Sequence, residues 1–254
     1  MDKRGRKGIE VVPLWISKKL IKAYKVLEEC YSKYSAPYVS CSWGKDSSLV
    51  MHLVNVVNPS TPVVFMDSGY GMSDTYKFRD WYLENVGIEN YHEVPCPENY
   101  IELNLKYGLP SIDRTQSDHE KVKQIIKKDV LDEYAKKQGW DCCIWGIRAE
   151  ETRGRAILLR QKGLLYESNG IGKCSPIGWW KSKDVWLAID ALNIPYNPLY
   201  DKEMPPFFTR ETNKNSGWLT TDKANKGRVI WMKRFYPEEY KKLLELFPEV
   251  NNYV

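Results

Sequence analysis

The sequence predicts an α/β protein in which a mostly parallel, doubly wound β-sheet is covered by helices. Two observations lead to this prediction. Short apolar runs typical of strands alternate with longer stretches of helical periodicity. The first strand-like run is followed by a tight polar turn and an apolar helix, which is the order of a βα unit in a parallel sheet. Ligands bind such sheets beyond the carboxyl ends of the strands, so the turns that follow strands are candidate sites.

The predicted elements follow one another in a regular order. Each helix carries apolar residues near helical spacing, and each strand is a short apolar run bounded by turn residues. The predicted helices are 14–34, 47–57, 73–84 and 121–138. The predicted strands are 38–41, 61–66, 91–94 and 141–146.

The pattern changes in the last third of the chain. A helix is predicted at 182–189, and 199–227 is irregular, polar and proline-containing, which favours a mobile lid. Residues 228–250 predict one or two helices broken at Pro237 and Pro248. We therefore divide the chain into a basic N-terminal arm and helix (1–35), a sheet domain (36–201) and a helical and irregular C-terminal extension (202–254).

Composition and charge restrict the class of protein. The 254 residues are 43% hydrophobic and 28% charged, which is typical of a soluble globular enzyme. No apolar run approaches the roughly 18 residues of a membrane span, and the N-terminus has no signal-peptide core, so we expect a cytoplasmic protein that does not bind membranes. The first 25 residues hold eight lysines and arginines against two acidic residues. This basic arm either contacts nucleic acid or is simply solvated.

Cysteine and histidine spacing predicts no metal or iron–sulfur site. None of the six cysteines forms a Cys-x-x-Cys pair, which favours a reducing compartment over a disulfide framework. The cysteines are Cys30, Cys41, Cys96, Cys142, Cys143 and Cys174. The three histidines, His52, His92 and His119, share no metal-ligand spacing.

The turn after the first strand is the strongest candidate for a ligand site. Its sequence, preceded by Ser40, is Ser42-Trp43-Gly44-Lys45-Asp46-Ser47. The first amides of a helix lack partners and its dipole is positive at that end, so phosphate is stabilised there. The order of residues excludes a Walker loop and a Gly-x-Gly-x-x-Gly fingerprint. The alternative is an ordinary strand-to-helix turn. Because Trp43 is not glycine, the turn must suit a residue with a Cβ.

Two further turns carry polar residues after predicted strands. Gly146, Arg148, Arg153 and Arg155 follow the fourth strand, where guanidinium groups can bind phosphate or sulfate oxygens and Gly146 can let the backbone approach a ligand. The alternative is a wet surface cluster in which the arginines pair with neighbouring glutamates.

The segment Asp67-Ser68-Gly69 ends the second strand. A carboxylate there can accept hydrogen bonds from a ribose or base, or hold Mg²⁺ through water. The alternative is a turn aspartate that hydrogen-bonds its own backbone.

Together these motifs resemble the phosphoadenosine phosphosulfate (PAPS) reductase family, part of the PP-loop ATP pyrophosphatase, or adenine nucleotide alpha hydrolase-like, group. The resemblance covers roughly residues 36–201. The matching stretches, in chain order, are Ser42–Ser47, Asp67-Ser-Gly, Gly146-x-Arg…Arg155, Pro176-Ile…Trp180-x-x-x-Asp184-Val-Trp186 and Asn197-Pro-Leu-Tyr200.

The resemblance implies a five-stranded parallel sheet with an adenine nucleotide across its carboxyl edge. By that likeness Asp67 and Gly69 border the nucleoside, and Arg148 with Arg155 grips the distal anion. The residues that it implies for the phosphates are Ser42, Gly44, Lys45, Asp46 and Ser47.

The chain also departs from the family. PAPS reductases carry a C-terminal Glu-Cys-Gly-Leu-His segment whose cysteine attacks the sulfonate, and no cysteine here lies beyond Cys174. Other relatives place iron–sulfur cysteines where this chain has Ser216-Gly-Trp-Leu-Thr220. We therefore expect no iron–sulfur cluster.

The resulting expectation is an enzyme that cleaves ATP between its α and β phosphates and transfers the adenylyl group. Lys45, Asp46 and Arg148 are the expected catalytic residues, with Mg²⁺ accompanying the nucleotide. One alternative is a PAPS or adenylyl-sulfate reductase in which Cys174, at a different position in the sequence, takes the role of the family's C-terminal nucleophile. Another is a non-catalytic nucleotide-binding module. The acceptor, a protein partner or sulfur carrier, and a homodimeric state stay open.

Overall fold

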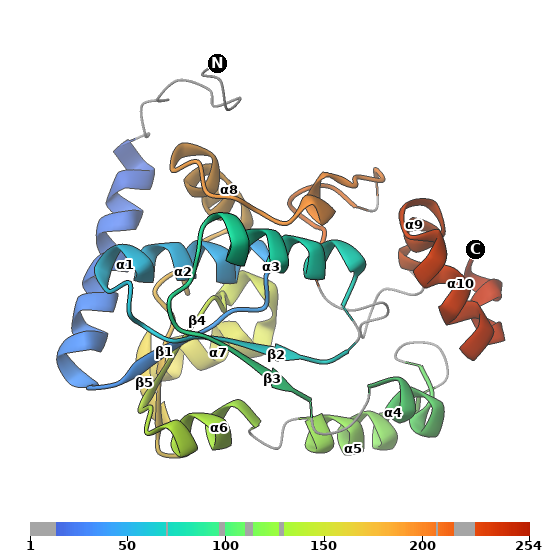
Figure 1. Ribbon diagram of the computed structural model, residues 1–254, viewed down its shortest axis with the longest axis horizontal. Coiled ribbons are helices and arrows are strands. Elements are labelled where there is room, and N and C mark those ends of the chain that lie inside the picture. The colour runs from blue at the N-terminus through green and yellow to red at the C-terminus, as the bar shows by residue number, and fades with distance from the viewer. Residues whose placement is uncertain are drawn as a thin grey trace.

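The computed structural model describes residues 14–69, 71–96, 100–109, 114–126, 130–206, 208–215 and 227–254. They form one six-stranded sheet in the order β3-β2-β1-β4-β6-β5, with helices on both faces (Figure 1). The strands are β1 Pro37–Ser40, β2 Val63–Asp67, β3 Tyr91–Pro95, β4 Cys142–Trp145, β5 Leu165–Ser168 and β6 Ile171–Cys174. All neighbouring strands are parallel except β5 and β6, which are antiparallel. The predicted fold class is confirmed.

The α-helices cover the sheet in two layers. Figure 1 shows α2, α3 and α8 above the sheet and α4, α5 and α6 below it. The α-helices are α1 Leu14–Lys33, α2 Lys45–Val57, α3 Ser73–Asn85, α4 Tyr100–Tyr107, α5 Gln116–Ile126, α6 Val130–Gln138, α7 Arg153–Lys162, α8 Ser182–Ala191, α9 Arg228–Phe235 and α10 Pro237–Leu246. The 3-10 helices are η1 Ala149–Glu151, η2 Pro198–Asp201 and η4 Pro248–Tyr253. None of the described helices is long and apolar enough to cross a membrane.

Alternation along the strands assigns side chains to the two layers. Val39 belongs to the large core between the sheet and α1, α2 and α8. Its neighbour Tyr38 belongs to the smaller cluster between the sheet and α6. Val63 and Val64 divide in the same way on β2. Successive side chains of a strand point to opposite faces, so a sheet covered on both sides reads as a continuous apolar run.

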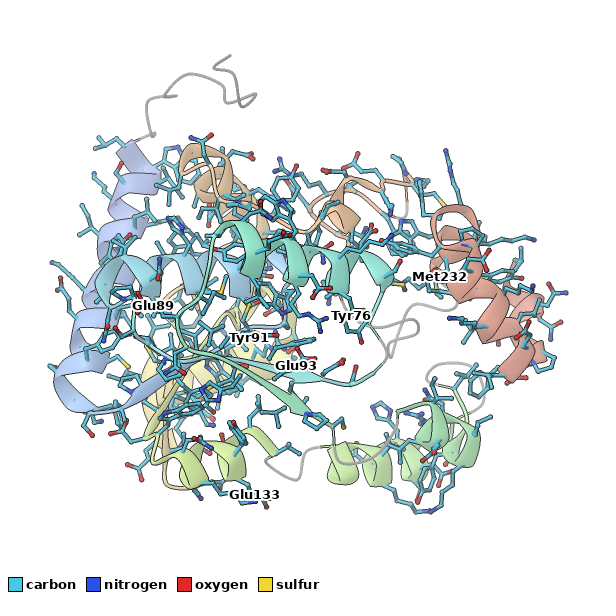
Figure 2. The ribbon with its side chains drawn as sticks, in the orientation of Figure 1. Tyr76, Glu89, Tyr91, Glu93, Glu133 and Met232 are labelled. Carbon is cyan, nitrogen blue, oxygen red and sulfur yellow. The ribbon has the colours of Figure 1, made fainter. Side chains whose placement is uncertain are left out.

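Side chains also join the edge strand β3 to its helix. Tyr91 and Glu93 project from β3 toward α3 (Figure 2), and the Glu93 carboxylate accepts a hydrogen bond from Arg79 Nη1 at 3.0 Å.

Several predicted elements need correction. The sheet has six strands where the resemblance implied five. Neither β5 nor β6 was among the strands predicted by residue range, and the two pair through a two-residue turn at Asn169 and Gly170, both with positive φ. The described parts of the helix predicted over 121–138 belong to α5, which already begins at Gln116, and to α6; residues 127–129 lie outside the described residues. The helices α4 and α7 had no predicted counterpart. The C-terminal helices end as predicted, with new helical segments starting at Pro237 and Pro248.

The strand order positions the site. Chain continuity runs from β1 to β2 on one side, whereas β4 pairs with β1 on the other side. The connection after β1 therefore leads to one side of the sheet, and the connection after β4 leads to β5 and β6 on the other side. Such a switch point leaves a crevice between the two turns, where ligands bind in open α/β sheets.

Candidate functional site

A pocket of about 800 Å³ opens at the switch point between β1 and β4. Three segments far apart in the sequence build its walls: the turn after β1, the turn after β4, and the stretch from η2 to residue 215. The lining residues are Ser40, Ser42, Gly44, Lys45, Asp46, Ser47, Trp145, Gly146, Ile147, Arg148, Glu150, Glu151, Arg155, Ser182, Tyr200, Glu211, Thr212, Asn213, Lys214 and Asn215. This size suits a cofactor-sized or nucleotide-sized ligand.

The turn after β1 is held in shape by the hydroxyl of Ser47. Ser47 Oγ donates to the Gly44 carbonyl at 3.0 Å and accepts from the Ser42 amide at 3.1 Å. Helix α2 then begins at Lys45, after an extended Gly44. The amides of Gly44 and Asp46 have no hydrogen-bond partner within the described part of the chain. These two donors are available to an anion at the helix N-terminus.

Trp43 sits in this turn, but its side chain points away from the pocket. Its φ is +59°, in the left-handed region that favours glycine. The indole is fully buried, and its ring lies 6.0 Å from that of Phe78 and 5.6 Å from that of Tyr82. The turn therefore keeps a glycine-type backbone, contrary to the expectation that it suits a residue with a Cβ. Any contact of Trp43 with a ligand would have to come from its backbone.

The carboxylate of Asp46 joins the two main cations of the pocket. One oxygen accepts from Lys45 Nζ at 2.7 Å, and the other accepts from Arg148 Nε at 2.7 Å. Both cations are almost completely buried. Burial lowers the pKa of the Arg148 guanidinium, but the charge of Asp46 and neighbouring glutamates raises it by more, so the net shift is upward. Lys45 and Arg148 thus converge on one anionic group, although 102 positions separate Arg148 from Asp46.

Two glutamates hold the arginines of the second turn. Glu150 accepts from Arg148 Nη1 at 2.8 Å and from the Ser182 amide at the start of α8. Glu151 accepts from the Arg148 amide at 2.8 Å and also pairs with Arg155. The arginine–glutamate pairs expected of a surface cluster are therefore present. Arg148 is nevertheless buried, and both arginines line the pocket.

Gly146 is needed for contact between the two turns. A Cβ at this position would lie 2.7 Å from the Asp46 carbonyl carbon and 2.8 Å from the Ser47 amide nitrogen. Real Cβ contacts are essentially never this short. Gly146 thus approaches the backbone of the turn after β1. It also lines the pocket, and its predicted close approach to a ligand stays a prediction.

Nine of the predicted site residues line the pocket and five do not. Those that line it are Ser40, Ser42, Gly44, Lys45, Asp46, Ser47, Gly146, Arg148 and Arg155. Those outside its lining are Trp43, Asp67, Ser68, Gly69 and Arg153.

The residues outside the lining have other positions. Asp67 lies at the same edge of the sheet, where its Oδ1 accepts from the Gly69 amide at 2.9 Å and from the Tyr76 hydroxyl at 2.7 Å. Arg153 is the exposed first residue of α7. Asp67 thus has the geometry of a turn aspartate that accepts a hydrogen bond from its own backbone. Its contact with a nucleoside stays a prediction.

The third wall was not predicted from the sequence. Tyr200 is buried, and its hydroxyl accepts from the Lys45 amide at 3.2 Å. The side-chain amide of Asn215 donates to the Ser42 carbonyl at 2.7 Å. The buried Asn197 donates to Thr75 Oγ1 at 3.1 Å and reaches the Trp43 carbonyl. The Asn197-Pro-Leu-Tyr200 stretch belongs to the family resemblance and could have indicated Tyr200, whereas no sequence signal pointed to Asn215.

The thiols do not reach the pocket. Cys174 is fully buried on β6, and its Sγ faces the Val26 carbonyl at 4.0 Å. Hydrogen bonding with Cys30 and burial raise the pKa of Cys174, so the reactive thiolate is disfavoured. Cys96, at the end of β3, is only half-buried but is not part of the lining. Cys174 is therefore not in a position to act as the nucleophile of a reductase at this pocket. The stretch Ser216–Thr220 lies outside the described residues.

Comparison with known proteins agrees with the resemblance. Residues 36–237 match the family model of the phosphoadenosine phosphosulfate reductase domain. The adenosine 5'-phosphosulfate reductase of Bacillus cytotoxicus is 31% identical over 186 residues, covering 72% of this chain and 76% of that protein.

Two solved structures share the fold at low identity. A PAPS reductase from Candida auris, in a phosphate complex, has a TM-score of 0.58 at 17% identity over 85% of this chain and 100% of that one. The FMN adenylyltransferase of Candida glabrata, with FAD and inorganic pyrophosphate, has a TM-score of 0.51 at 12% identity over 76% of this chain and 62% of that one. At these identities the likeness shows the fold alone. The family match, together with the relative at 31% identity, shows that this chain belongs to the phosphoadenosine phosphosulfate reductase domain family.

Proposed function

We propose that this protein is an adenine-nucleotide enzyme that cleaves ATP between its α and β phosphates and transfers the adenylyl group to an acceptor. The observation that carries this proposal is the convergence of Lys45 and Arg148 on a single carboxylate beside the open amides of α2. Two buried cations and a helix N-terminus stabilise an anion. A polyphosphate is the ligand class that matches this combination of donors.

The reaction assigns a distinct task to each wall. An acceptor oxygen attacks the α phosphorus and forms a new P–O bond, while the bond from the α phosphorus to the α–β bridging oxygen breaks and pyrophosphate leaves with that electron pair. Lys45 and the amides of Gly44 and Asp46 would hold the oxygens that gain charge. Arg148 and Arg155 would orient the distal phosphates. Electrostatic stabilisation and positioning of this kind suffice for phosphoryl and nucleotidyl chemistry, with no protein nucleophile.

Magnesium fits the charges of the pocket. Among the described lining residues, the cations are Lys45, Arg148, Arg155 and Lys214, and the carboxylates are Asp46, Glu150, Glu151 and Glu211. These already balance, so a triphosphate would leave excess negative charge unless a cation came with it. Within the described residues, no group of three or more His, Cys, Asp or Glu side chains could hold a metal. Mg²⁺ needs only one or two carboxylates when phosphates supply the other ligands, and Asp46 and Glu150 would serve. The ion would neutralise charge on the phosphates.

Thiol-dependent sulfonate reduction is the second candidate, because the Bacillus relative is named an adenosine 5'-phosphosulfate reductase. Against it, Cys174 is buried and does not line the pocket. Sulfite release from adenylyl sulfate with a thiol reductant would favour this candidate over adenylyl transfer.

The predicted partners stay predictions. Within the basic arm and helix predicted at 1–35, residues 1–13 lie outside the described residues, and contact of this segment with nucleic acid is untested. A homodimer, a protein partner and a sulfur carrier are equally untested.

Titration calorimetry and product analysis test the proposed function. Wild-type protein with Mg²⁺ should bind ATP and release pyrophosphate, not ADP and phosphate. The adenylyl group should appear on the acceptor, or as AMP where water takes the place of the acceptor. Lys45→Ala should weaken ATP binding by roughly tenfold to a hundredfold, since a charge-assisted hydrogen bond contributes about 1.5–3 kcal/mol. The control Lys22→Ala removes an exposed lysine of α1 and should bind ATP like the wild type. Unchanged pyrophosphate release in Lys45→Ala would overturn the proposal.

A further inference from the structure

The hydroxyl of Tyr200 stands directly in front of helix α2. It accepts the Lys45 amide, the first N–H of that helix, at 3.2 Å. One of the orphan donors at the start of α2 is thus taken up by a side chain from 155 residues further along the chain.

The Tyr200 hydroxyl also has a hydrogen that it can donate, and this hydrogen needs an acceptor. A phenol has one O–H donor and lone pairs that accept, and here the Lys45 N–H donates to one of those lone pairs. Burial raises the pKa of Tyr200, so the group carries its proton at neutral pH. Within the described part of the chain, no side chain or carbonyl accepts from Tyr200 Oη. A buried polar hydrogen is normally hydrogen-bonded, so this donor calls for an acceptor.

The pocket is where that acceptor would lie. Tyr200 lines the pocket, and Oη is the only polar atom of its side chain. The phenol ring is held in place, because Trp186 packs edge-on to it with ring centroids 5.1 Å apart. The oxygen also borders the turn, 3.3 Å from where a Cβ on Gly44 would stand. The ring cannot turn its hydroxyl away from the loop without repacking this core.

We infer that Tyr200 is a nucleotide-binding residue that donates its hydroxyl hydrogen to a phosphate oxygen bound at the turn after β1. The Lys45 amide donates to the phenol oxygen, and the phenol donates to the ligand, so the hydroxyl extends the donor row of the helix into the pocket. This inference rests on the proposed nucleotide site and adds a recognition group for its phosphates. Because the phenol oxygen accepts the Lys45 N–H, its own O–H becomes a stronger donor, since hydrogen bonds in a chain polarise one another.

Two replacements at position 200, measured by titration calorimetry, separate donation from a structural role. Tyr200→Phe should weaken ATP and pyrophosphate binding by about tenfold, which corresponds to one hydrogen bond to a charged group. Its binding of adenosine, which has no phosphate, should not change. Tyr240→Phe is the matched control, because it removes another buried tyrosine hydroxyl, one that faces Asn251 at the C-terminal end of the chain.

Incorporation of 3-fluorotyrosine at position 200 decides between donor and acceptor. Fluorine makes the phenol a stronger donor and a weaker acceptor, so ATP affinity should equal or exceed that of the wild type at a pH where the fluorophenol is protonated. A loss of affinity in the fluorinated protein would mean that Tyr200 acts only as an acceptor for the loop, and it would overturn the inference. This variant keeps the shape of the side chain and stays informative if Tyr200→Phe fails to fold.

The outcomes also distinguish this inference from the proposed function. Wild-type ATP affinity in Tyr200→Phe would overturn the inference alone, provided that Lys45→Ala has lost binding. ATP binding that depends on the Tyr200 hydroxyl but yields ADP would support the inference and overturn adenylyl transfer. If the wild-type protein bound neither ATP nor pyrophosphate, both would be overturned.

Discussion

Trp43 serves the core and the ligand loop at the same time. Its backbone adopts a conformation that costs a residue with a Cβ about 1–2 kcal/mol, and its indole occupies the centre of an aromatic cluster with Phe65, Phe78 and Tyr82. Full burial of an indole contributes more than that cost, because removing a buried aromatic side chain typically costs about 3–5 kcal/mol. A strained turn is therefore tolerated where glycine would ordinarily stand.

Substitution of Trp43 should reverse the usual order of alanine and glycine. Both Trp43→Ala and Trp43→Gly lose the indole, and each should lower the free energy of unfolding by about 3–5 kcal/mol. The glycine variant should nevertheless be more stable than the alanine variant by about 1 kcal/mol, since only alanine keeps the positive-φ strain. Urea unfolding of the two variants measures the difference. A more stable alanine variant would show that the turn relaxes out of the left-handed region.

Asp46 and Glu150 both hold Arg148, but in different surroundings. The Asp46 side chain is 17% exposed and bridges two buried cations, whereas that of Glu150 is 44% exposed. Removing one partner of a buried ion pair leaves an uncompensated charge, whereas exposed pairs contribute little. The two carboxylates should therefore differ in their effect on stability.

Neutralising these carboxylates tests that difference. Asp46→Asn should lower the free energy of unfolding by about 3 kcal/mol, and Glu150→Gln by less than about 1 kcal/mol. Inorganic phosphate should recover more stability in Asp46→Asn, because an anion can then occupy the place between Lys45 and Arg148. Denaturant unfolding with and without phosphate provides the measurement. Equal losses in the two variants would contradict the buried bridge.

At the scale of elements, the pocket depends on how closely two βα turns approach each other. Gly146, after β4, lies against the peptide that joins Asp46 to Ser47 at the start of α2. β1 and β4 are paired over their whole length, from Pro37 with Cys142 to Ser40 with Trp145, so the turns leave the sheet side by side. The close approach brings Arg148 within reach of Asp46.

A methyl group at Gly146 should separate the two turns. Gly146→Ala should cost about 1–3 kcal/mol of unfolding free energy, as other overpacked sites do, and should weaken phosphate binding. Gly154→Ala is the matched control, because its Cβ would meet only Thr152 Oγ1 at 4.0 Å and lies in a helix. That control should be as stable as the wild type or up to about 1 kcal/mol more stable. Thermal unfolding and phosphate titration compare the pair, and equal behaviour would refute the close contact.

The hairpin of β5 and β6 is an element that local sequence could have indicated. Asn169-Gly170 is the residue pair that two-residue turns with positive φ prefer. The strands on either side of this turn are only four residues long, so the apolar pattern that predicts a strand is weak there.

At the scale of the whole molecule, the C-terminal segment completes the phosphate-type loop. Asn215 holds the Ser42 carbonyl across 173 residues, and Tyr200 holds the Lys45 amide. Asp74, at the start of α3, accepts hydrogen bonds from Lys202 and from Tyr236 at 2.9 Å. The described parts of 200–254 therefore contact both the turn after β1 and the start of α3.

Nucleotide binding should thus protect three distant segments together. Hydrogen exchange with bound ATP should slow in peptides from 40–48, 146–155 and 211–215, since all three line the pocket. Peptides from α6, on the opposite face of the sheet, should not change. Adenosine, which lacks phosphates, should protect 40–48 less than ATP does. Protection confined to 40–48 would mean that the C-terminal wall takes no part in binding.

The sequence by itself determined the α/β class, the family, and the meeting of the Lys45 loop with Arg148 and Arg155. These follow from local patterns: apolar periodicity, a strand–turn–helix motif, and the rule that turns after parallel strands share one edge. Their roles in binding stay predictions.

Only the tertiary structure decided which way Trp43 faces, that Asp67 and Arg153 lie outside the pocket, and that Tyr200 and Asn215 complete the loop. Each of these depends on packing between segments that are far apart in the chain, where a side chain's direction follows from the neighbours that bury it. Sequence spacing carries no information about those neighbours.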